Sequence, residues 1–203
     1  MTREQLKTYA KQILANNYWP IIGITVLYAI ITGAASSIIG PVALYFFYPL
    51  YHGLICSIAA FSDGQNPTVG DMFTEGFNGK YYLRRVGGMA WMDLFIFLWS
   101  LLFAIPGVIK SYSYAMTPYI LAKYPEIPAK EALKLSMKIM DGRKAELFVL
   151  QLSFIGWAIL ASLTFGILSL FFVIPYMIIT EVLWYKNVMK EVSDSGEFVY
   201  TAN

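Results

Sequence analysis

Four ionisable side chains lie inside long apolar stretches of this 203-residue chain, where they are the first candidates for chemistry: His52, Asp93, Lys110 and Glu181. Ionisable residues are costly to bury in a membrane, and those that occur there usually pair with one another or serve a function. Lys110 lies near the end of its stretch and can reach water through its long side chain. The candidate intramembrane polar site therefore consists of His52, Asp93 and Glu181.

Two arrangements of this polar site stay open. His52 and Asp93 lie at similar depths from the same end of their apolar stretches, so they can form a buried pair that offsets the cost of burial. In the alternative, each residue bonds to local partners. Glu181 lies about one helical turn from the end of its stretch, within reach of Lys186 or Tyr185.

The sequence lacks the motifs of well-known catalytic and metal centres. It contains no Gly-rich phosphate loop, no HExxH and no CxxC, and a single histidine makes a His-based metal site improbable. The single cysteine, Cys56, excludes an internal disulfide and is expected to pack as a small apolar residue. We therefore expect no catalytic residues, no cofactor and no metal.

The composition is typical of an integral membrane protein. The chain is 58% hydrophobic and only 14% charged, whereas soluble domains are about 25% charged. Its mean hydropathy is +0.56. The apolar runs are continuous and do not alternate with period two, which predicts helices and excludes barrel strands.

The apolar stretches predict an all-α membrane protein with six transmembrane helices arranged as three hairpins. A helix needs about 20 apolar residues to cross a bilayer. The stretch 86–124 is longer than one crossing and is interrupted at Ile105-Pro106-Gly107. It is either a hairpin or one long kinked helix, and we favour the hairpin. The six predicted spans are about 19–39, 41–61, 86–105, 108–124, 146–164 and 167–185.

The distribution of positive charge predicts the orientation of these spans. Cytoplasmic loops of membrane proteins carry an excess of Lys and Arg. Six spans with both termini on one side place every Lys and Arg except Lys110 on that side. We therefore expect a multi-pass protein of the plasma membrane with cytoplasmic N- and C-termini. This pattern accounts for the basic residues, so nucleic acid is not an expected partner.

Residues 1–192 are predicted to form one membrane domain of three repeats, at about 2–61, 66–124 and 126–190, followed by a flexible tail at 193–203. Each repeat has a short interfacial or amphipathic helix before its hairpin, which predicts a quasi-threefold arrangement. Each also has a proline in the second helix of the hairpin: Pro49, Pro118 and Pro175. A proline inside a helix kinks it and frees a carbonyl group. The kinks are either hinges at a site or simple packing curvature.

Two of the short helices are predicted to be amphipathic. Residues 2–17 have an apolar stripe of Leu6, Ala10, Ile13 and Leu14. The segment 126–144 carries basic residues that we expect to contact anionic lipids: Lys130, Lys134, Lys138, Arg143 and Lys144. In the alternative, these helices are solvated and pack on other parts of the protein.

Several stretches resemble a known family. LWSLLFAIPGVIKSYSYAMTPYILAKYPEIPAKEALKLSMKIMDGRKAELFVLQLSFIGW (98–157), TFGILSLFFVIPYMIITEVLWY (164–185) and the N-terminal LKTYAKQILANNYW resemble the DUF975 family of bacterial integral membrane proteins. The resemblance implies a bacterial source and a membrane location. It implies no activity and no catalytic residues, because the family has none established.

We expect a non-enzymatic role. Small-residue stripes and basic surface helices form binding surfaces, which is typical of a scaffold, accessory or immunity-type protein. Its expected partners are membrane lipids, together with a second copy of the chain or another membrane protein. The alternative is a small transporter or channel-like protein that uses the polar site around His52 and Asp93. A membrane-embedded enzyme acting on lipid is the weakest interpretation.

Overall fold

The computed structural model describes residues 1–39, 43–80, 82–102, 104–164 and 166–196. Within these residues the chain is mostly helical and contains no strand. The elements are α1 (Arg3–Asn16), α2 (Tyr18–Ile39), α3 (Ala43–Ser62), α4 (Val69–Gly76), α5 (Tyr82–Leu102), α6 (Ala104–Tyr114), α7 (Thr117–Lys123), α8 (Ala129–Ile139), α9 (Lys144–Leu152), α10 (Ile155–Leu163), the π-helical η1 (Ser169–Val173) and α11 (Ile174–Asp194).

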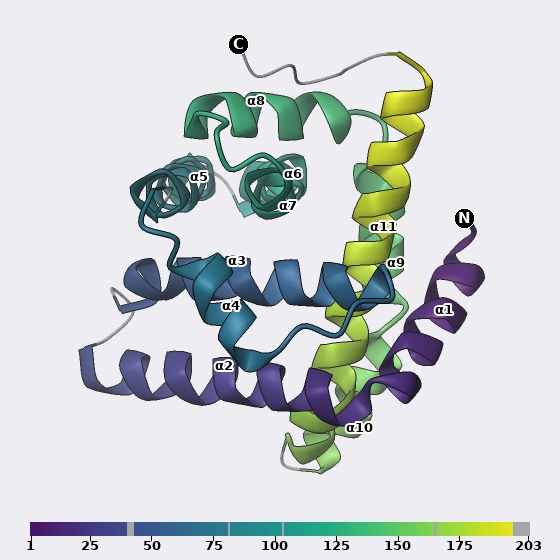
Figure 1. Ribbon diagram of the computed structural model, residues 1–203. Coiled ribbons are helices and arrows are strands. Elements are labelled where there is room, and N and C mark those ends of the chain that lie inside the picture. The colour runs from purple at the N-terminus through teal and green to yellow at the C-terminus, as the bar shows by residue number, and fades with distance from the viewer. Residues whose placement is uncertain (40–42, 81, 103, 165, 197–203) are drawn as a thin grey trace.

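The long helices form three hairpins that run in different directions. The first pairs α2 with α3, and the second pairs α5 with α6 and then α7. In the third, α9 and α10 lead outward and η1 and α11 return. In Figure 1, α2 and α3 run across the view, α5 and α6 are seen end-on, and α11 runs up the view. The molecule is therefore not a bundle of parallel helices.

The stretch 86–124 is a hairpin and not one long helix. Its first arm, α5, ends at Leu102, and α6 begins at Ala104 and packs alongside it. The predicted break at Ile105-Pro106-Gly107 thus falls in the first turn of α6, where a proline removes no helical hydrogen bond.

Several predicted spans are interrupted in the structure. The stretch 108–124 divides between α6 and α7, and 146–164 divides between α9 and α10. The carbonyl of Ser153, at the second break, accepts a hydrogen bond from Lys7 Nζ of α1 at 3.1 Å. The last arm continues past the predicted end at 185 to Asp194, so helix replaces the first residues of the predicted tail. The rest of that tail, from 197 on, lies outside the described residues.

Within the described part of the chain, three helical segments are long and apolar enough to cross a membrane: Tyr18–Ile38, Lys144–Leu163 and Ser169–Asp194. By contrast, α6 and α7 contain 11 and 7 residues. Each of these two is too short to cross alone, because a crossing needs about 20 residues. The six spans of the sequence analysis therefore stay a prediction.

Only one of the three predicted proline kinks lies inside an α-helix. Pro49 is within α3, whereas Pro118 and Pro175 lie in the first turns of α7 and α11. Pro118 thus begins a new helix, where the first turn does not use the N–H that proline lacks. Pro175 instead lies in the continuous helical segment Ser169–Asp194, directly after the π-helical turn η1. The kinks themselves stay a prediction.

The short helices pack on the hairpins through their apolar faces. α1 buries Leu6, Ala10, Ile13 and Leu14 and contacts α11, and α8 lies on α5 and α7. α4 lies so close to α3 that a Cβ at Gly53 would be 1.9 Å from the carbonyl oxygen of Met72. These apolar stripes are therefore covered by protein, which matches the alternative of helices packed on the protein itself, although Tyr9 of α1 and Val69 of α4 remain exposed.

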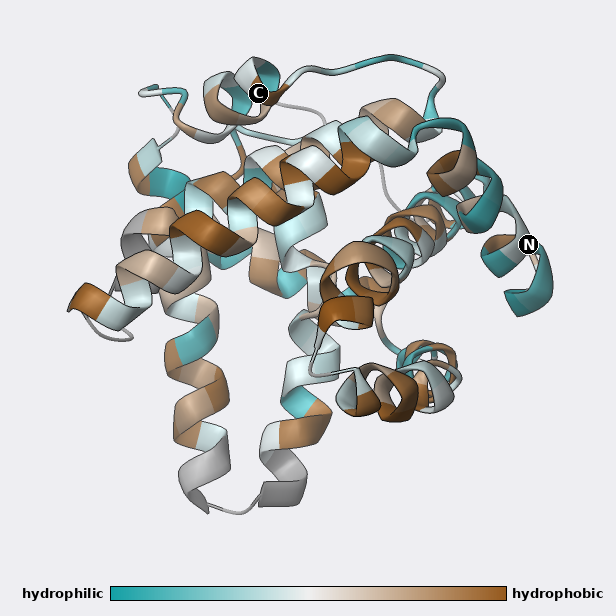
Figure 2. Cartoon of the chain, turned by 90° about the horizontal axis from the view of Figure 1, so that it is seen from below, coloured by the Kyte–Doolittle hydropathy of each residue, from teal (hydrophilic) through white to brown (hydrophobic). Residues whose placement is uncertain are grey.

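The outer surfaces of the hairpins remain strongly apolar. Large hydrophobic side chains are exposed along α2, α5, α6, α9 and α10, among them Ile38, Phe97, Ile109, Ile159 and Leu163. Figure 2 shows hydrophobic residues along the hairpin arms and hydrophilic residues around the N-terminal helix. An apolar exterior of this extent is typical of a surface that contacts lipid or another protein.

Candidate functional site

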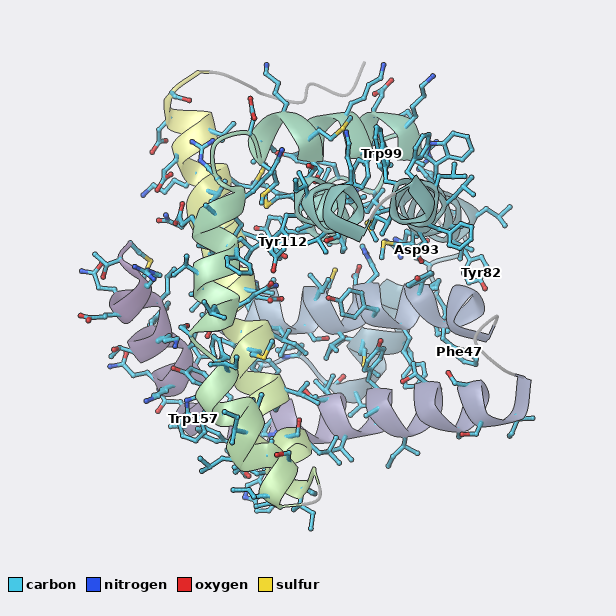
Figure 3. The ribbon with its side chains drawn as sticks, turned by 180° about the vertical axis from the view of Figure 1, so that it is seen from behind. Phe47, Tyr82, Asp93, Trp99, Tyr112 and Trp157 are labelled. Carbon is cyan, nitrogen blue, oxygen red and sulfur yellow. The ribbon has the colours of Figure 1, made fainter. Side chains whose placement is uncertain are left out.

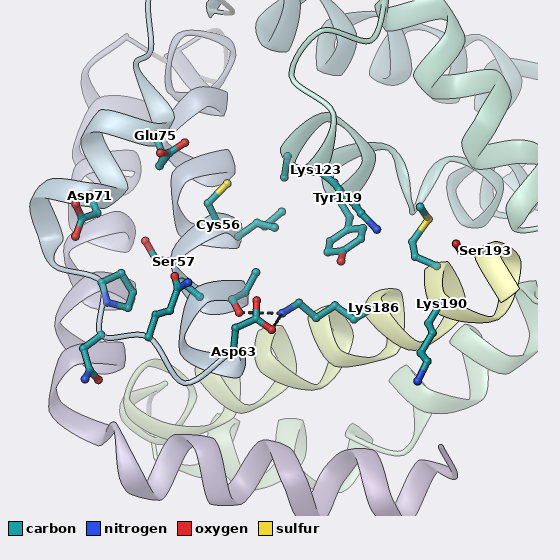
Figure 4. Close-up of a pocket in the computed structure, with 18 of the residues that line it drawn as sticks. Cys56, Ser57, Asp63, Asp71, Glu75, Tyr119, Lys123, Lys186, Lys190 and Ser193 are labelled. Carbon is teal, nitrogen blue, oxygen red and sulfur yellow. Dashed lines mark hydrogen bonds and ion pairs between the residues drawn. The ribbon is translucent and has the colours of Figure 1, made fainter. Parts of the chain in front are cut away.

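A large cavity opens where the second arms of the three hairpins come together (Figure 4). Its volume is about 960 Å³. The lining comes from α3 with the loop after it, from α4, from α7 and from the end of α11. We call this cavity the vestibule. Its size is at the upper end of the range of small-molecule sites, about 300–1,000 Å³.

Lys186 fixes one wall of the vestibule. Its Nζ donates to Asp63 Oδ1 at 2.6 Å, to Ser62 Oγ at 2.7 Å and to the carbonyl of Ala59 at 2.9 Å. An ammonium group has three donors, so Lys186 is fully used. This cluster ties α11 to the C-terminal end of α3. The sequence analysis instead offered Lys186 as one of two possible partners of Glu181.

The α4 wall is held at both ends. At its start, Asp71 Oδ2 accepts from the Thr68 amide at 2.7 Å and from the Thr68 hydroxyl at 2.8 Å, which forms a capping box. These hydrogen bonds lower the pKa of Asp71. At its end, the buried Arg85 of α5 donates to the carbonyls of Glu75 and Gly76. The last turn of α4 thus has its free carbonyl groups satisfied.

Among the charged side chains that line the vestibule, Glu75 of α4, Lys123 of α7 and Lys190 of α11 have no ion pair in the described chain, and the same holds for Asp71 and Asp194. Lys123 Nζ lies 5.6 Å from the centre of the Tyr124 ring. In Figure 4, Asp71 and Glu75 lie on one side of the cavity, and Lys123 and Lys190 lie on the other. The vestibule therefore has an acidic and a basic side.

The predicted polar residues His52 and Asp93 hydrogen-bond to different partners. Asp93 of α5 accepts from the Tyr48 hydroxyl, on the side of α5 that faces α3 (Figure 3). The His52 side chain is buried, and its Nε2 lies 3.6 Å from Cys56 Sγ. The cavity beside His52 measures about 10 Å³, which is room for about one water molecule.

Glu181 belongs to a chain of polar side chains between three helices. Gln151 of α9 donates through Nε2 to Glu181 Oε1 at 2.8 Å, and its Oε1 accepts from the Tyr112 hydroxyl of α6 at 2.8 Å. Tyr112 lies between α6 and the third hairpin (Figure 3). Within the described residues, the expected partners Lys186 and Tyr185 do not hydrogen-bond to Glu181. Gln151 takes their place.

The basic residues of α8 lie on its outer face. Lys130, Lys134 and Lys138 are exposed, while the opposite face packs on the protein. Arg143 and Lys144 are half-buried, and Arg143 donates to the carbonyl of Ile139 at 3.2 Å. The described residues contain no group of three or more His, Cys, Asp and Glu side chains that could hold a metal ion.

The sequence analysis did not single out the charged residues of the vestibule. A usable signal exists, because Asp63, Lys123 and Lys190 all stand at or just after the ends of second arms in the three predicted repeats. In the predicted quasi-threefold arrangement, equivalent ends of the repeats would meet around a common axis. Aligning the repeats by these ends would have brought the three residues together.

No match to the chain was found among curated proteins or among solved structures. A family profile described as "Protein of unknown function (DUF975)" matches residues 82–192, which is more than half of the chain. The matched region begins at α5 and includes the second and third hairpins with α8. The chain therefore belongs to the DUF975 family.

Proposed function

We propose that this chain is a multi-pass protein of the bacterial plasma membrane that binds lipids or a membrane-protein partner without catalysing a reaction, as a scaffold, accessory or immunity-type protein. One observation carries the proposal: the hairpins expose large apolar side chains, while a polar vestibule opens where their second arms meet. The first feature suits a lipid environment, and the second suits a binding site that water can reach.

The repeat prediction is part of this proposal. In it, three units at about 2–61, 66–124 and 126–190 surround a quasi-threefold axis. The packing of the short helices supports it, since α4 lies on α3 of the preceding unit and α8 lies on α7 of the preceding unit. α1 in turn packs on α11 of the last unit, which closes the ring. The vestibule then lies on the axis.

The proposed topology has six crossings and cytoplasmic termini. The contact made by Lys110 supports it, because Lys110 is the only basic residue assigned to the outside and lies on α6. Its Nζ lies 5.0 Å from the centre of the Trp99 ring on the neighbouring arm. A lysine stacked on a tryptophan is a common arrangement at a membrane interface. The exposed lysines of α8 then face the anionic cytoplasmic leaflet.

A transport function has less support. The predicted site around His52 and Asp93 adjoins a cavity of only about 10 Å³, whereas small-molecule sites measure about 300 Å³ or more.

Native mass spectrometry of the full chain, released gently from membranes, tests the proposal together with flotation in vesicles. We expect the protein to float with vesicles after alkaline washing and to retain a defined number of lipids or a stoichiometric protein partner. Release by alkaline washing contradicts the membrane assignment. A mass spectrum that shows the chain without bound lipid or protein partner contradicts the binding function.

A further inference from the structure

Some charged side chains of the vestibule are held by partners within the protein, and others have no ion pair there and can contact a ligand. Lys186 and Asp63 form an ion pair at 2.6 Å, and Asp71 caps α4 through Thr68. Lys186, Asp63 and Asp71 therefore hold the helices that form the walls of the cavity. Glu75, Lys123 and Lys190 also line the cavity, and none of the three forms an ion pair in the part of the chain that the structure describes.

The available charges are separated across the cavity. Glu75 is on the α4 side with Asp71, and Lys123 and Lys190 are on the α7 and α11 side (Figure 4). Asp194, one turn after Lys190, also lines the cavity, so the basic side has two ammonium groups and one carboxylate. The acidic side has two carboxylates. A simple anion would meet repulsion on the acidic side, and a simple cation would meet repulsion on the basic side.

We propose that the vestibule binds a zwitterion, with a primary ammonium directed to Glu75 and a phosphate directed to Lys123 and Lys190. The inference rests on the proposed binding function and names its ligand class. Lysine ammonium groups bind phosphate as point charges, and hydrogen bonds to ionised groups are about twice as strong as neutral ones. Phosphoethanolamine has this chemistry, either as a soluble molecule or as a lipid headgroup.

The remaining lining suits such a ligand. Ile55, Ala59, Ala60, Ala122 and Met189 add apolar and small side chains between the charged sides. They leave room for the short alkyl chain that joins the two charged groups. A cavity of about 960 Å³ also admits a glycerol unit and water beside a headgroup.

Cys56 provides a direct readout of occupancy. It is the only cysteine of the chain, and it lines the vestibule. Its rate of modification by a small thiol reagent is measured in the purified full-length protein, with increasing phosphoethanolamine, inorganic phosphate or ethanolamine. We expect phosphoethanolamine to protect Cys56 at a concentration about tenfold lower than either single-charge compound, since one charged hydrogen bond contributes about 1.5–3 kcal/mol.

Two variants and two matched controls separate the charges. Glu75→Gln should remove the preference for phosphoethanolamine over phosphate, and Lys123→Gln should weaken protection by both compounds about tenfold. Glu131→Gln on α8 and Lys11→Gln on α1 change exposed residues outside the vestibule and should leave protection unchanged. Equal protection by phosphate and phosphoethanolamine, or an unchanged preference in Glu75→Gln, would overturn the proposal.

A final comparison identifies the source of the ligand. Cys56 is modified in nanodiscs of phosphatidylethanolamine and in nanodiscs of phosphatidylcholine. Slower modification in the first supports a lipid headgroup, and equal rates with protection by soluble phosphoethanolamine support a free ligand. Flotation of the same preparation distinguishes failure of the ligand assignment from failure of the proposed membrane function. A protein that floats and retains lipid but shows no preference for phosphoethanolamine refutes only the ligand assignment.

Discussion

Lys186 Nζ of α11 lies 2.6 Å from Asp63 Oδ1, just beyond the end of α3, and this contact joins the first and third hairpins at the rim of the vestibule. The two residues are 123 positions apart in the sequence. The ion pair is partly exposed, with side-chain exposures of 24% and 60%, so solvent weakens its electrostatic contribution. Its main effect is to hold α11 in register with α3, because Lys186 also donates to Ser62 and Ala59.

We expect Lys186→Gln to destabilise the protein by about 1 kcal/mol, since most of its hydrogen bonds are lost and little charge is buried. For a chain of this size the melting temperature should fall by about 2–4 °C. Thermal unfolding in detergent measures the change. Lys190→Gln is the matched control, because Lys190 lines the same cavity without an ion pair in the described chain. An equal loss in both variants would show that the Lys186 contacts do not matter.

The contact between α3 and α4 depends on Gly53. A Cβ at this position would lie 1.9 Å from the carbonyl oxygen of Met72, and backbone cannot move aside as a side chain can. Gly53→Ala should therefore cost about 1–3 kcal/mol or more. Gly23→Ala on α2 is the control, because a Cβ there meets nothing within 4 Å. The control should be neutral or stabilising by up to about 1 kcal/mol. Comparable stability of the two variants in thermal unfolding would contradict this packing.

Gln151 satisfies two partly buried polar groups at once, the Tyr112 hydroxyl and the Glu181 carboxylate. Gln151→Leu leaves the Tyr112 hydroxyl and the Glu181 carboxylate without their partner, so we expect a loss of about 2–4 kcal/mol. Adding Glu181→Leu removes the stranded carboxylate and should restore part of the stability. Denaturation of the single and double variants forms a double-mutant cycle. Additive losses would show that Gln151 and Glu181 do not interact.

The cap of α4 should depend on pH. Hydrogen bonds from the Thr68 amide and hydroxyl lower the pKa of Asp71. The folded-state pKa is thus below the unfolded-state value of about 3.9, so the cap stabilises α4 above that value and is lost as pH falls through the lowered pKa. Hydrogen exchange of the α4 amides should accelerate only below about pH 4. In Asp71→Asn this acid-dependent step should vanish, and its persistence would assign the effect to another group.

The sequence predicted the helical class and the three hairpins better than it predicted their geometry. Continuous apolar runs identify helices, and the break near Pro106 separates α5 from α6 because proline restricts the backbone. The same rule did not predict that Pro118 stands at the start of a separate helix, α7. Whether a proline kinks a helix or starts a new one depends on the preceding residues, and the break after Tyr114 has no strong sequence signal.

The candidate site was predicted less well, for a physical reason. Burial cost correctly marks His52, Asp93 and Glu181 as residues that need partners. The cost of burial does not identify the partner. Tyr48 and Gln151 have no distinguishing feature in the sequence, and only the packing of the hairpins brings them next to Asp93 and Glu181. The charged residues Glu75, Lys123 and Lys190 are exposed, so no cost of burial marks them in the sequence. They form a site only because three distant chain segments come together in the fold.

The most direct test of the whole arrangement compares two thiols in intact cells with a maleimide that does not cross membranes. One protein retains Cys56 in the vestibule, and the other carries Lys110→Cys in a Cys56→Ser background. We predict that the thiol at position 110 is labelled from outside and that Cys56 is labelled only after the cells are permeabilised. Labelling of Cys56 in intact cells, or labelling at position 110 only after permeabilisation, would contradict the proposed topology and the cytoplasmic vestibule.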